Sequence, residues 1–397
     1  MRLIHTSDWH LGKVFFGKKI LEEQRIFFEN NFFPLLREVK PDLLVVTGDL
    51  VDKPIPDYET LKTLEEILYQ LFELKIPTYI ILGNHDSKRV SLYKEFLKFF
   101  NFVIEDGLTC FFNPLEFVSS QNEKLYFYLF PYLSPFELKE LAESFYKDTF
   151  KNFISSKIQI FLQDLIFFLF SNLTLKKPAI LLGHFAVERG LFSGEELFLK
   201  GLGGEELFPL SLLKDFDLVL LGHLHRLQRV NPHIYYSGSI MPYSFEESQY
   251  KKGVWLIEIK EGKLLKTEAI TLNSPLKLKV LKGSFKELLS HPQELAYTKI
   301  ILKDCTPVYN PFERLKANFP NLLVLEYENS LESSSLSTEN SFWLEGNFQE
   351  KERMELNEET LFINFYRTVE GKEVDLKILN LFKEYVSNFK EKREGGE

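Results

Sequence analysis

Uninterrupted hydrophobic runs recur between residues 42 and 222, and each ends in glycine followed by polar residues. The runs are DLLVVT before Gly48, TYIIL before Gly83, AILL before Gly183 and LVLL before Gly222. A run that is hydrophobic throughout, rather than at alternate positions, is typical of a strand buried on both faces. With a short strand expected over residues 2–6, the pattern predicts a sheet whose two faces are both covered.

Helical patterns lie between these runs. In one of them Leu61, Leu64, Leu68 and Leu71 share a face, and in the next Tyr93, Phe96, Leu97 and Phe100 do so. Strands that alternate with helices favour an α/β fold with parallel strands. In such folds, ligands bind at the carboxyl ends of the strands, where the glycines and polar residues of this chain stand.

The pattern changes after about residue 232 and becomes rich in strands, at 235–239, 254–260 and 263–272. We assign residues 1–275 to a first domain. Residues 276–328 then read as a small α/β unit, with strands at 276–282, 299–304 and 322–328 and a helix at 284–291.

The last part of the chain has two different compositions. Residues 329–359 are rich in serine and glutamate, and predict a flexible linker. Residues 360–397 hold two amphipathic helices, at about 360–368 and 375–390, the second with an apolar stripe at Ile378, Phe382, Tyr385 and Phe389. Such a stripe beyond a linker suits binding of a helix in a partner's groove, the alternative being that it packs on the chain's own domain.

Composition narrows the classes of protein. The chain of 397 residues is 45% hydrophobic, which suffices for a large core. Its two cysteines form no disulfide framework and the first residues include no apolar signal segment, so we expect a cytoplasmic protein. The most apolar stretch, 160–170, is too short to span a bilayer, so we expect no membrane partner. The net charge of −9 argues against a large basic surface that binds nucleic acid, so binding of DNA would need local basic patches, bound cations or a partner.

The first candidate metal-binding side chains occur in HTSDWHLG, where Asp8 and His10 stand two residues apart. On extended backbone they point to the same side, but a lone pair of this kind is weak evidence. The ends of the hydrophobic runs supply more of the same side chains, and five of the chain's eight histidines belong to the resulting set. The full set is Asp8, His10, Asp49, Asn84, His85, His184, His223 and His225. Each histidine taken alone could be a core residue with its hydrogen bonds satisfied.

Taken together, these side chains indicate a metal centre. Mixed nitrogen and oxygen donors favour Mn, Fe, Zn or Co over Ca or Mg. The set is too large for one ion and suits two ions that share a bridging carboxylate. Two-metal sites are built for in-line displacement at phosphorus.

The chain resembles the calcineurin-like metallophosphoesterases in five motifs, which occur in the order of that superfamily. They are SDWH at 7–10, GDLVD at 48–52, GNHD at 83–86, GHF at 183–185 and GHLH at 222–225. Within the superfamily, HTSDWHLG at 5–12 and GSIMPYSFEE at 238–247 resemble the SbcD family, the nuclease subunits of SbcC–SbcD complexes. The resemblance implies a four-layer α/β/β/α sandwich, a small α/β capping domain at 276–328 and C-terminal partner-binding helices.

The resemblance also implies a role for each residue. Asp8, His10, Asp49 and His225 would hold a first metal, and Asp49 would bridge to a second held by Asn84, His184 and His223. His85 would face the scissile phosphate as a catalytic residue instead of binding metal, and Asp52 would orient it. The implied cofactors are two Mn²⁺ ions, with Mg²⁺ a poorer substitute.

The activity implied is that of a Mn-dependent DNA nuclease, a 3′ to 5′ exonuclease on duplexes and an endonuclease on single strands and hairpins. It would act as a homodimer, and an SbcC-type SMC-like ATPase would bind its C-terminal helices. One alternative is a metallophosphoesterase for cyclic nucleotides or other small phosphodiesters. A phosphoprotein phosphatase fits less well, because Lys53 and Pro54 follow Asp52 where those enzymes have Arg-Gly. Another alternative is a scaffold without catalysis that bridges ATPase and DNA.

Basic residues follow several of the metal motifs and would form a rim for DNA phosphates, the alternative being ordinary solvated charges. They are Lys13, Lys18, Lys53, Lys88, Arg89 and Arg226. Two further side chains near the first motif are expected to be structural. His5 should pack beneath the site, and Trp9 should pack in the core rather than stack on a nucleotide.

Overall fold

The computed structural model describes residues 1–92, 94–119, 122–134, 136–138, 140–141, 158–193, 207–328, 378–379 and 382–383. The chain divides into two compact units, Met1–Glu332 and Ser333–Glu397. The predicted linker and nearly all of the predicted tail lie outside the described residues. The finer division at residues 275, 328 and 359 stays a prediction.

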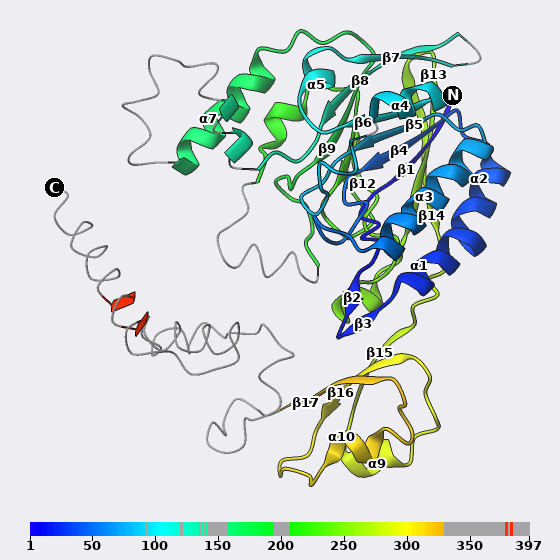
Figure 1. Ribbon diagram of the computed structural model, residues 1–397, viewed down its shortest axis with the longest axis vertical. Helices are drawn as coiled ribbons and strands as arrows, with labels where there is room; N and C mark the ends of the chain where they lie inside the picture. Colours follow the sequence, from blue (N-terminus) through cyan, green and yellow to red (C-terminus); the bar gives the residue numbers. More distant parts are fainter. Residues whose placement is uncertain are drawn as a thin grey trace. The chain divides into compact units, whose positions relative to one another are not determined.

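The first of two six-stranded sheets contains the N-terminal strand (Figure 1). Its order is β14 (Lys263–Thr271), β13 (Gly253–Lys260), β1 (Arg2–Thr6), β4 (Leu43–Thr47), β5 (Thr78–Ile81) and β6 (Phe102–Glu105). In this sheet β1, β4, β5 and β6 are parallel to one another, and β13 pairs antiparallel with β1. The carboxyl ends of β1, β4 and β5 therefore lie at one edge.

The second sheet has the order β11 (Gln228–Asn231), β12 (Ile234–Tyr236), β10 (Leu218–Gly222), β9 (Ala179–His184), β8 (Lys124–Phe130) and β7 (Leu115–Val118). Its four central strands are parallel, and its two outer strands are antiparallel to their neighbours. β9 ends in the pair Gly183-His184, and β10 ends at Gly222, which His223 follows.

The two sheets pack face to face. Buried side chains from both fill the space between them, among them Leu3, Val45, Leu129, Leu182 and Leu220. The alternate residues of the first sheet face its covering helices instead. This arrangement explains why the strands are hydrophobic at every position, and it confirms the predicted four-layer sandwich.

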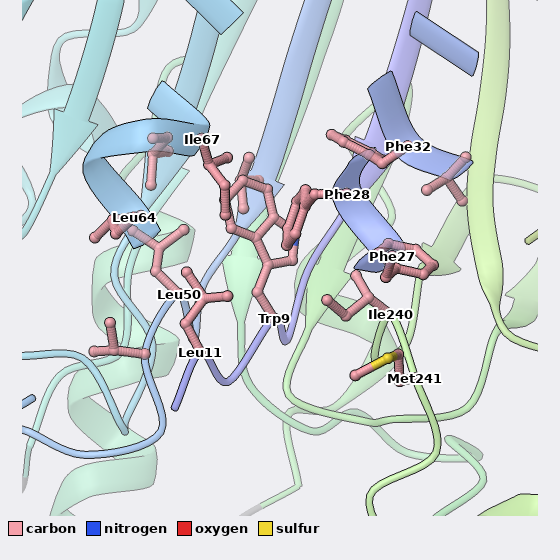
Figure 2. Packing of buried hydrophobic residues seen from close by; sticks show 14 of the residues in the cluster. Trp9, Leu11, Phe27, Phe28, Phe32, Leu50, Leu64, Ile67, Ile240 and Met241 are labelled. Atoms are coloured by element: carbon pink, nitrogen blue, oxygen red, sulfur yellow. The ribbon is translucent and has the colours of Figure 1, made fainter. Parts of the chain in front are cut away.

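Helices α1 (Leu21–Phe27), α2 (Phe33–Val39) and α3 (Tyr58–Glu73) cover the first sheet, with a π-helical segment, Phe28–Phe32, between the first two. Figure 2 shows Trp9 among them. Its ring centroid lies 5.0 Å from that of Phe28 and 6.2 Å from that of Phe32, and its side chain is fully buried. Trp9 is therefore a core residue, as predicted. α5 (Thr109–Phe112) and α7 (Ile158–Ser171) cover the second sheet.

The second predicted helix is shorter than its apolar spacing suggests. It consists of α4 (Lys94–Leu97) and a 3₁₀ turn, Lys98–Phe100, while Tyr93 lies outside the described residues. Phe96 is 60% exposed, and Leu97 and Phe100 pack against the core. No helix of the described ranges is long and apolar enough to cross a membrane.

Residues 278–327 form a three-stranded parallel sheet with two short helices. The elements are β15 (Leu278–Gly283), α9 (Phe285–Leu289), β16 (Tyr297–Leu302), α10 (Pro311–Leu315) and β17 (Leu322–Tyr327), of which the sequence pattern missed only α10. This unit has its own small core. It contacts the hairpin of β2 (Val14–Phe15) and β3 (Lys18–Lys19), where Lys18 donates to Asn321 at 3.1 Å.

Candidate metal centre

The candidate metal ligands come together where strands of the two sheets end. Asp8 and His10 follow β1, Asp49 follows β4 and Asn84 follows β5 in the first sheet. From the second sheet, His184 is the last residue of β9, and His223 and His225 follow β10. Asp8, His10, Asp49, His184 and His225 are all at most 5% exposed. Such a cluster of buried donors matches the prediction made from the hydrophobic runs.

Glycine is required at three of these strand ends because neighbouring chains approach too closely for a side chain. A Cβ atom on Gly48 would lie 2.1 Å from His184 Nδ1, and one on Gly83 would lie 2.2 Å from Asp49 Oδ1. A Cβ atom on Gly222 would lie 1.9 Å from the carbonyl oxygen of Thr47. The glycines therefore allow the two sheets to bring their ligands together.

Four ligand residues have left-handed backbone. Asp8, His10, Asp49 and His223 have φ angles of +51°, +44°, +54° and +89°. Non-glycine residues rarely adopt this conformation, and where they do so it is often at a functional site. The turns carry these side chains away from their strands and toward the common centre.

One half of the centre consists of Asp8, His10 and His225, whose donor atoms all lie within 4.8 Å of one another. The Nε2 atoms of His10 and His225 are 3.2 Å apart. Both carboxylate oxygens of Asp8 also accept from the backbone N–H of His223, at 3.0 and 3.2 Å. The two motifs that contribute these residues are therefore joined directly.

The other half consists of Asn84, His184 and His223. Asn84 Oδ1 lies 3.0 Å from His184 Nε2 and 3.2 Å from His223 Nδ1. Asp49 stands between the halves, because its Oδ2 lies 3.5 Å from His10 Nε2 and 3.4 Å from His184 Nε2. A carboxylate that bridges two ions needs such a central position.

The hydrogen bonds of two histidines indicate that the centre fits cations. His184 Nδ1 lies 2.8 Å from the carbonyl oxygen of Thr47, and His225 Nδ1 lies 3.1 Å from Glu247 Oε1. Both partners are acceptors only, so Nδ1 carries the proton and Nε2 of the neutral ring offers a lone pair. In the neutral rings, the lone pair of His184 faces Asn84 Oδ1 and Asp49 Oδ2, and that of His225 faces His10 Nε2. Acceptors that approach one another in this way suit divalent metal ions between them.

Charge within the cluster shifts the pKa values of its members when no metal is bound. Burial alone would raise the pKa of Asp49, but the nearby rings of His184 and His10 outweigh burial and hold it well below its usual range. Burial lowers the pKa of His184, yet the charge of Asp49 prevails and raises it to about 9. A proton on His184 therefore balances Asp49 until a cation replaces it, so binding of metal should release a proton.

The contact between His85 and Asp52 differs from the one expected from the sequence, because it involves the backbone of Asp52 and not its carboxylate. His85 donates its backbone N–H to Asp49 Oδ1 at 2.9 Å, and its ring Nδ1 lies 2.9 Å from the backbone oxygen of Asp52. The Asp52 carboxylate lies instead 3.1 Å from Lys13 Nζ and 3.5 Å from His10 Nδ1. The expected orienting role thus belongs to the main-chain carbonyl of Asp52, and its carboxylate supports His10.

The predicted basic rim is only partly exposed. Lys13 is buried beside Asp52, so it is no surface residue. Lys18 lies over the ring of Tyr297 at 4.8 Å, and Lys88 pairs with Glu137. The guanidinium of Arg226 lies 4.4 Å from the ring of Tyr250. Lys53 and Arg89 are exposed.

Sequence reasoning missed several residues that support the ligands. Gln24, on α1, donates to the backbone oxygens of Trp9 and His10 at 3.1 and 2.8 Å. Glu247 accepts from His225 and from Lys252, and it lies within the GSIMPYSFEE stretch that marked the family resemblance. No spacing signal identifies Gln24, because its partners are main-chain atoms. His5 is buried with its Nε2 atom 2.9 Å from Thr47 Oγ1, so its predicted place beneath the site is correct.

Comparison with known proteins gives four findings. The family model of the calcineurin-like phosphoesterases matches residues 1–227, which include every predicted metal ligand. A Staphylococcus epidermidis protein, named as a subunit of the nuclease SbcCD, is 29% identical over 376 residues, 93% of each chain. A Staphylococcus saprophyticus protein of the same name is 29% identical over 379 residues, 94% of each chain. A crystal structure of the Thermus thermophilus protein TT1561 aligns with a TM-score of 0.34 and 14% identity, covering 68% of this chain and 98% of that one.

Proposed function

The chain belongs to the calcineurin-like phosphoesterase family, and from this premise we propose that it is a manganese-dependent DNA nuclease. The observation that carries the proposal is the position of Asp49 between two groups of buried donors, His10 with His225 and His184 with Asn84. Family membership makes the chain a metal-dependent hydrolase of phosphoesters. The two staphylococcal relatives, both named as parts of a nuclease, favour DNA as the substrate.

The mixed nitrogen and oxygen donors suit Mn²⁺ among other transition metals, and the resemblance to the SbcD family favours two Mn²⁺ ions, with Mg²⁺ a poorer substitute. Asp8, His10 and His225 would hold one ion, Asn84, His184 and His223 the other, with Asp49 shared. The ions would supply charge neutralisation at the phosphoryl oxygens and activation of water for in-line attack. The protein's own contribution is the rigid placement of these donors, which the glycine contacts and Gln24 support.

His85 is suited to act on the substrate rather than on the metal. Because its Nδ1 donates to the Asp52 carbonyl, its Nε2 atom is left for a phosphoryl or leaving oxygen, to which it would donate from the doubly protonated form of the ring. Its ring lies edge-on to that of His10, with 4.7 Å between centroids. His85 is partly exposed, whereas His10 is buried. We therefore assign His85 to stabilisation of charge on the phosphate or protonation of the leaving oxygen.

The finer activity follows the resemblance to the SbcD family. We propose exonuclease action in the 3′ to 5′ direction on duplexes and endonuclease action on single strands and hairpins, during DNA end processing in the cytoplasm. An SbcC-type ATPase would be the partner, bound through the C-terminal helices. Exposed Lys53 and Arg89 and the partly exposed Arg226 are candidates for contacts with DNA phosphates.

An exposed aromatic patch supports the proposed homodimer. It consists of Tyr69 and Phe72 on α3, Phe96 on α4 and the adjoining Phe99 and Phe100. Tyr69 is 58% exposed and Phe99 84% exposed. The ring of Tyr69 lies 6.4 Å from that of Phe72, and the rings of Phe72 and Phe96 each lie 5.1 Å from that of the partly buried Phe100, so these four rings are continuous. Continuous apolar surface of this kind marks protein interfaces.

The test uses end-labelled blunt duplex and hairpin DNA, with Mn²⁺ or Mg²⁺, in the presence and absence of the ATPase partner. We expect Mn²⁺-dependent cleavage that is lost in an Asp49→Asn variant, which controls for contaminating nucleases. A cyclic nucleotide is assayed in parallel. Hydrolysis of the cyclic nucleotide without cleavage of any DNA would favour the alternative of a small-phosphodiester hydrolase, and binding of DNA without any hydrolysis would favour the scaffold.

A further inference from the structure

A charged pair is buried behind His225, on the side away from the other ligands. Glu247 is fully buried, and Lys252 is 3% exposed. Glu247 Oε1 lies 3.1 Å from His225 Nδ1, and its Oε2 accepts from Lys252 Nζ at 2.6 Å. A buried ion pair is costly unless its remaining hydrogen bonds are satisfied.

Those remaining bonds are present. Glu247 Oε2 also accepts from the Ser239 hydroxyl and from the Tyr243 backbone N–H, each at 3.2 Å. Lys252 donates further to Ser239 Oγ at 2.6 Å and to the backbone oxygen of His225 at 2.8 Å. Both the ring and the main chain of His225 are therefore fixed by the same pair.

The segment that leads to the pair, residues 237–243, is anchored by several contacts. Ile240 and Met241 are fully buried in the helix-covered core (Figure 2). The ring of Tyr243 lies 5.5 Å from that of His10 and 6.0 Å from that of His225. Ser237 Oγ lies 2.7 Å from Ser7 Oγ, and Ser7 donates to Asp8. Residues 237–252 thus support the half of the centre made by Asp8, His10 and His225.

The other half has a different support. His184 Nδ1 is bound to the neutral carbonyl oxygen of Thr47. A carboxylate holds a histidine N–H more strongly than a carbonyl does and makes the opposite nitrogen a better donor to metal. Three donors converge on Glu247 Oε2, namely Lys252 Nζ, the Ser239 hydroxyl and the Tyr243 backbone N–H, and this arrangement suits a carboxylate.

We propose that Glu247, held by Lys252, is a positioning residue that fixes the Nδ1–H form of His225 and makes the two metal positions unequal. The position at Asp8, His10 and His225 is the one that depends on Glu247, and the position at Asn84, His184 and His223 does not. This inference rests on the proposed function, because it concerns the metals that the nuclease would use.

The experiment titrates the full-length, metal-free protein with Mn²⁺ by calorimetry. We expect the Glu247→Gln variant to bind one of its two ions about tenfold to a hundredfold more weakly, the usual effect of removing such a partner, and the other ion within about twofold of the parent. Glu246→Gln is the matched control, since Glu246 is the exposed neighbour in the same short 3₁₀ helix, Glu246–Gln249. Electron paramagnetic resonance should show a coupled Mn²⁺ pair in the parent and isolated Mn²⁺ in the Glu247 variant at limiting metal.

A double variant guards against misfolding, because Glu247→Gln leaves Lys252 buried without its charge partner. Glu247→Gln with Lys252→Met removes both charges and should show the same selective loss. The wild-type protein gives an independent readout by NMR with isotope-labelled histidine, where His225 should carry its proton on Nδ1. A proton on Nε2, or two ions bound at parental affinity by the folded variants, would overturn the inference. A parent that binds no Mn²⁺ would instead refute the proposed function.

Discussion

At the residue scale, binding of metal and action on the substrate are assigned to different side chains of neighbouring residues. Asn84 offers its side-chain oxygen to the cluster, within 3.0 Å of His184 Nε2. The ring of His85, one residue later, is turned to the Asp52 carbonyl through Nδ1. On the proposed assignment, one turn of the GNHD motif would supply both a metal ligand and a histidine that faces the substrate.

We predict that His85→Asn abolishes hydrolysis of DNA, by at least about a hundredfold, while two metals remain bound. The reason is that the ring is replaced without loss of a ligand to either ion. Anomalous scattering from Mn²⁺-soaked crystals measures the metals, and a DNA cleavage assay measures the rate. His223→Ala serves as the contrast and should weaken the second ion. Loss of an ion in His85→Asn would show that His85 is a ligand after all.

At the element scale, α3 illustrates how a helix next to the site begins. Asp57 is its N-cap and accepts from the backbone N–H of Thr60 at 2.9 Å. The same carboxylate pairs with Lys19 of β3 at 2.6 Å. The Lys19 and Thr60 hydrogen bonds lower the pKa of Asp57 to about 2. The cap thus joins the helix to the hairpin that follows the first motif.

We predict that Asp57→Ala lowers the free energy of unfolding by about 1 kcal/mol, the usual cost of losing such a cap. Because the folded-state pKa of Asp57 lies below its ordinary value, its contribution is present above about pH 4 and is lost as the pH falls toward 2. Urea unfolding at neutral pH and near the folded-state pKa checks this, with exposed Glu65→Ala on the same helix as the control. An equal loss at both pH values would contradict the assignment.

The sequence predicts some elements well and others poorly, for physical reasons. The strands that end at Gly48, Gly83 and Gly222 are recognisable because burial between two layers demands hydrophobic residues at every position. The helix at α4 is predicted less well, because Leu97 and Phe100 of the predicted face pack against the core while Phe96 is exposed. The strand ends predict that the candidate ligands gather at one place, and the structure brings these side chains together there.

The support of the ligands could not be predicted from spacing. Glu247 reaches His225 from a different segment of the chain, and the Asp52 carboxylate turns to Lys13 although its carbonyl serves His85. Such contacts depend on the relative position of elements that only the folded chain establishes. A sequence pattern gives the residue types of a site and leaves their partners open.

At the scale of the whole molecule, the net charge of −9 and the exposed aromatic patch point to assembly rather than to a broad basic surface. We predict a homodimer at micromolar concentration, which light scattering measures as twice the mass of one chain. Phe96→Glu should convert it to a monomer, because a charge in an apolar interface is desolvated without a partner. Leu265→Glu, at a residue 65% exposed on β14, is the matched control and should remain dimeric. A monomeric wild-type protein would contradict the proposal.

The C-terminal tail gives a further prediction at this scale. A chain truncated after Asn329 should retain most of its Mn²⁺-dependent cleavage of single-stranded DNA, because every proposed ligand lies at or before His225. It should no longer co-purify with the ATPase, since exposed apolar stripes on short helices are typical of such docking. Co-expression with the ATPase followed by affinity purification tests this. Full-affinity binding of the truncated chain would show that the tail is not the docking element.

The left-handed backbone of the candidate ligands implies that function is maintained at some cost in stability. Backbone with φ near +89°, as at His223, costs a non-glycine residue on the order of 1 kcal/mol. His223→Gly should therefore unfold at a higher urea concentration than His223→Ala, although both lack the imidazole and both lose activity. The difference between the two inactive proteins isolates the conformational strain that the fold sustains in order to hold this histidine in place. Selection for stability alone, without selection for catalysis, would be expected to replace such histidines and aspartates by glycine.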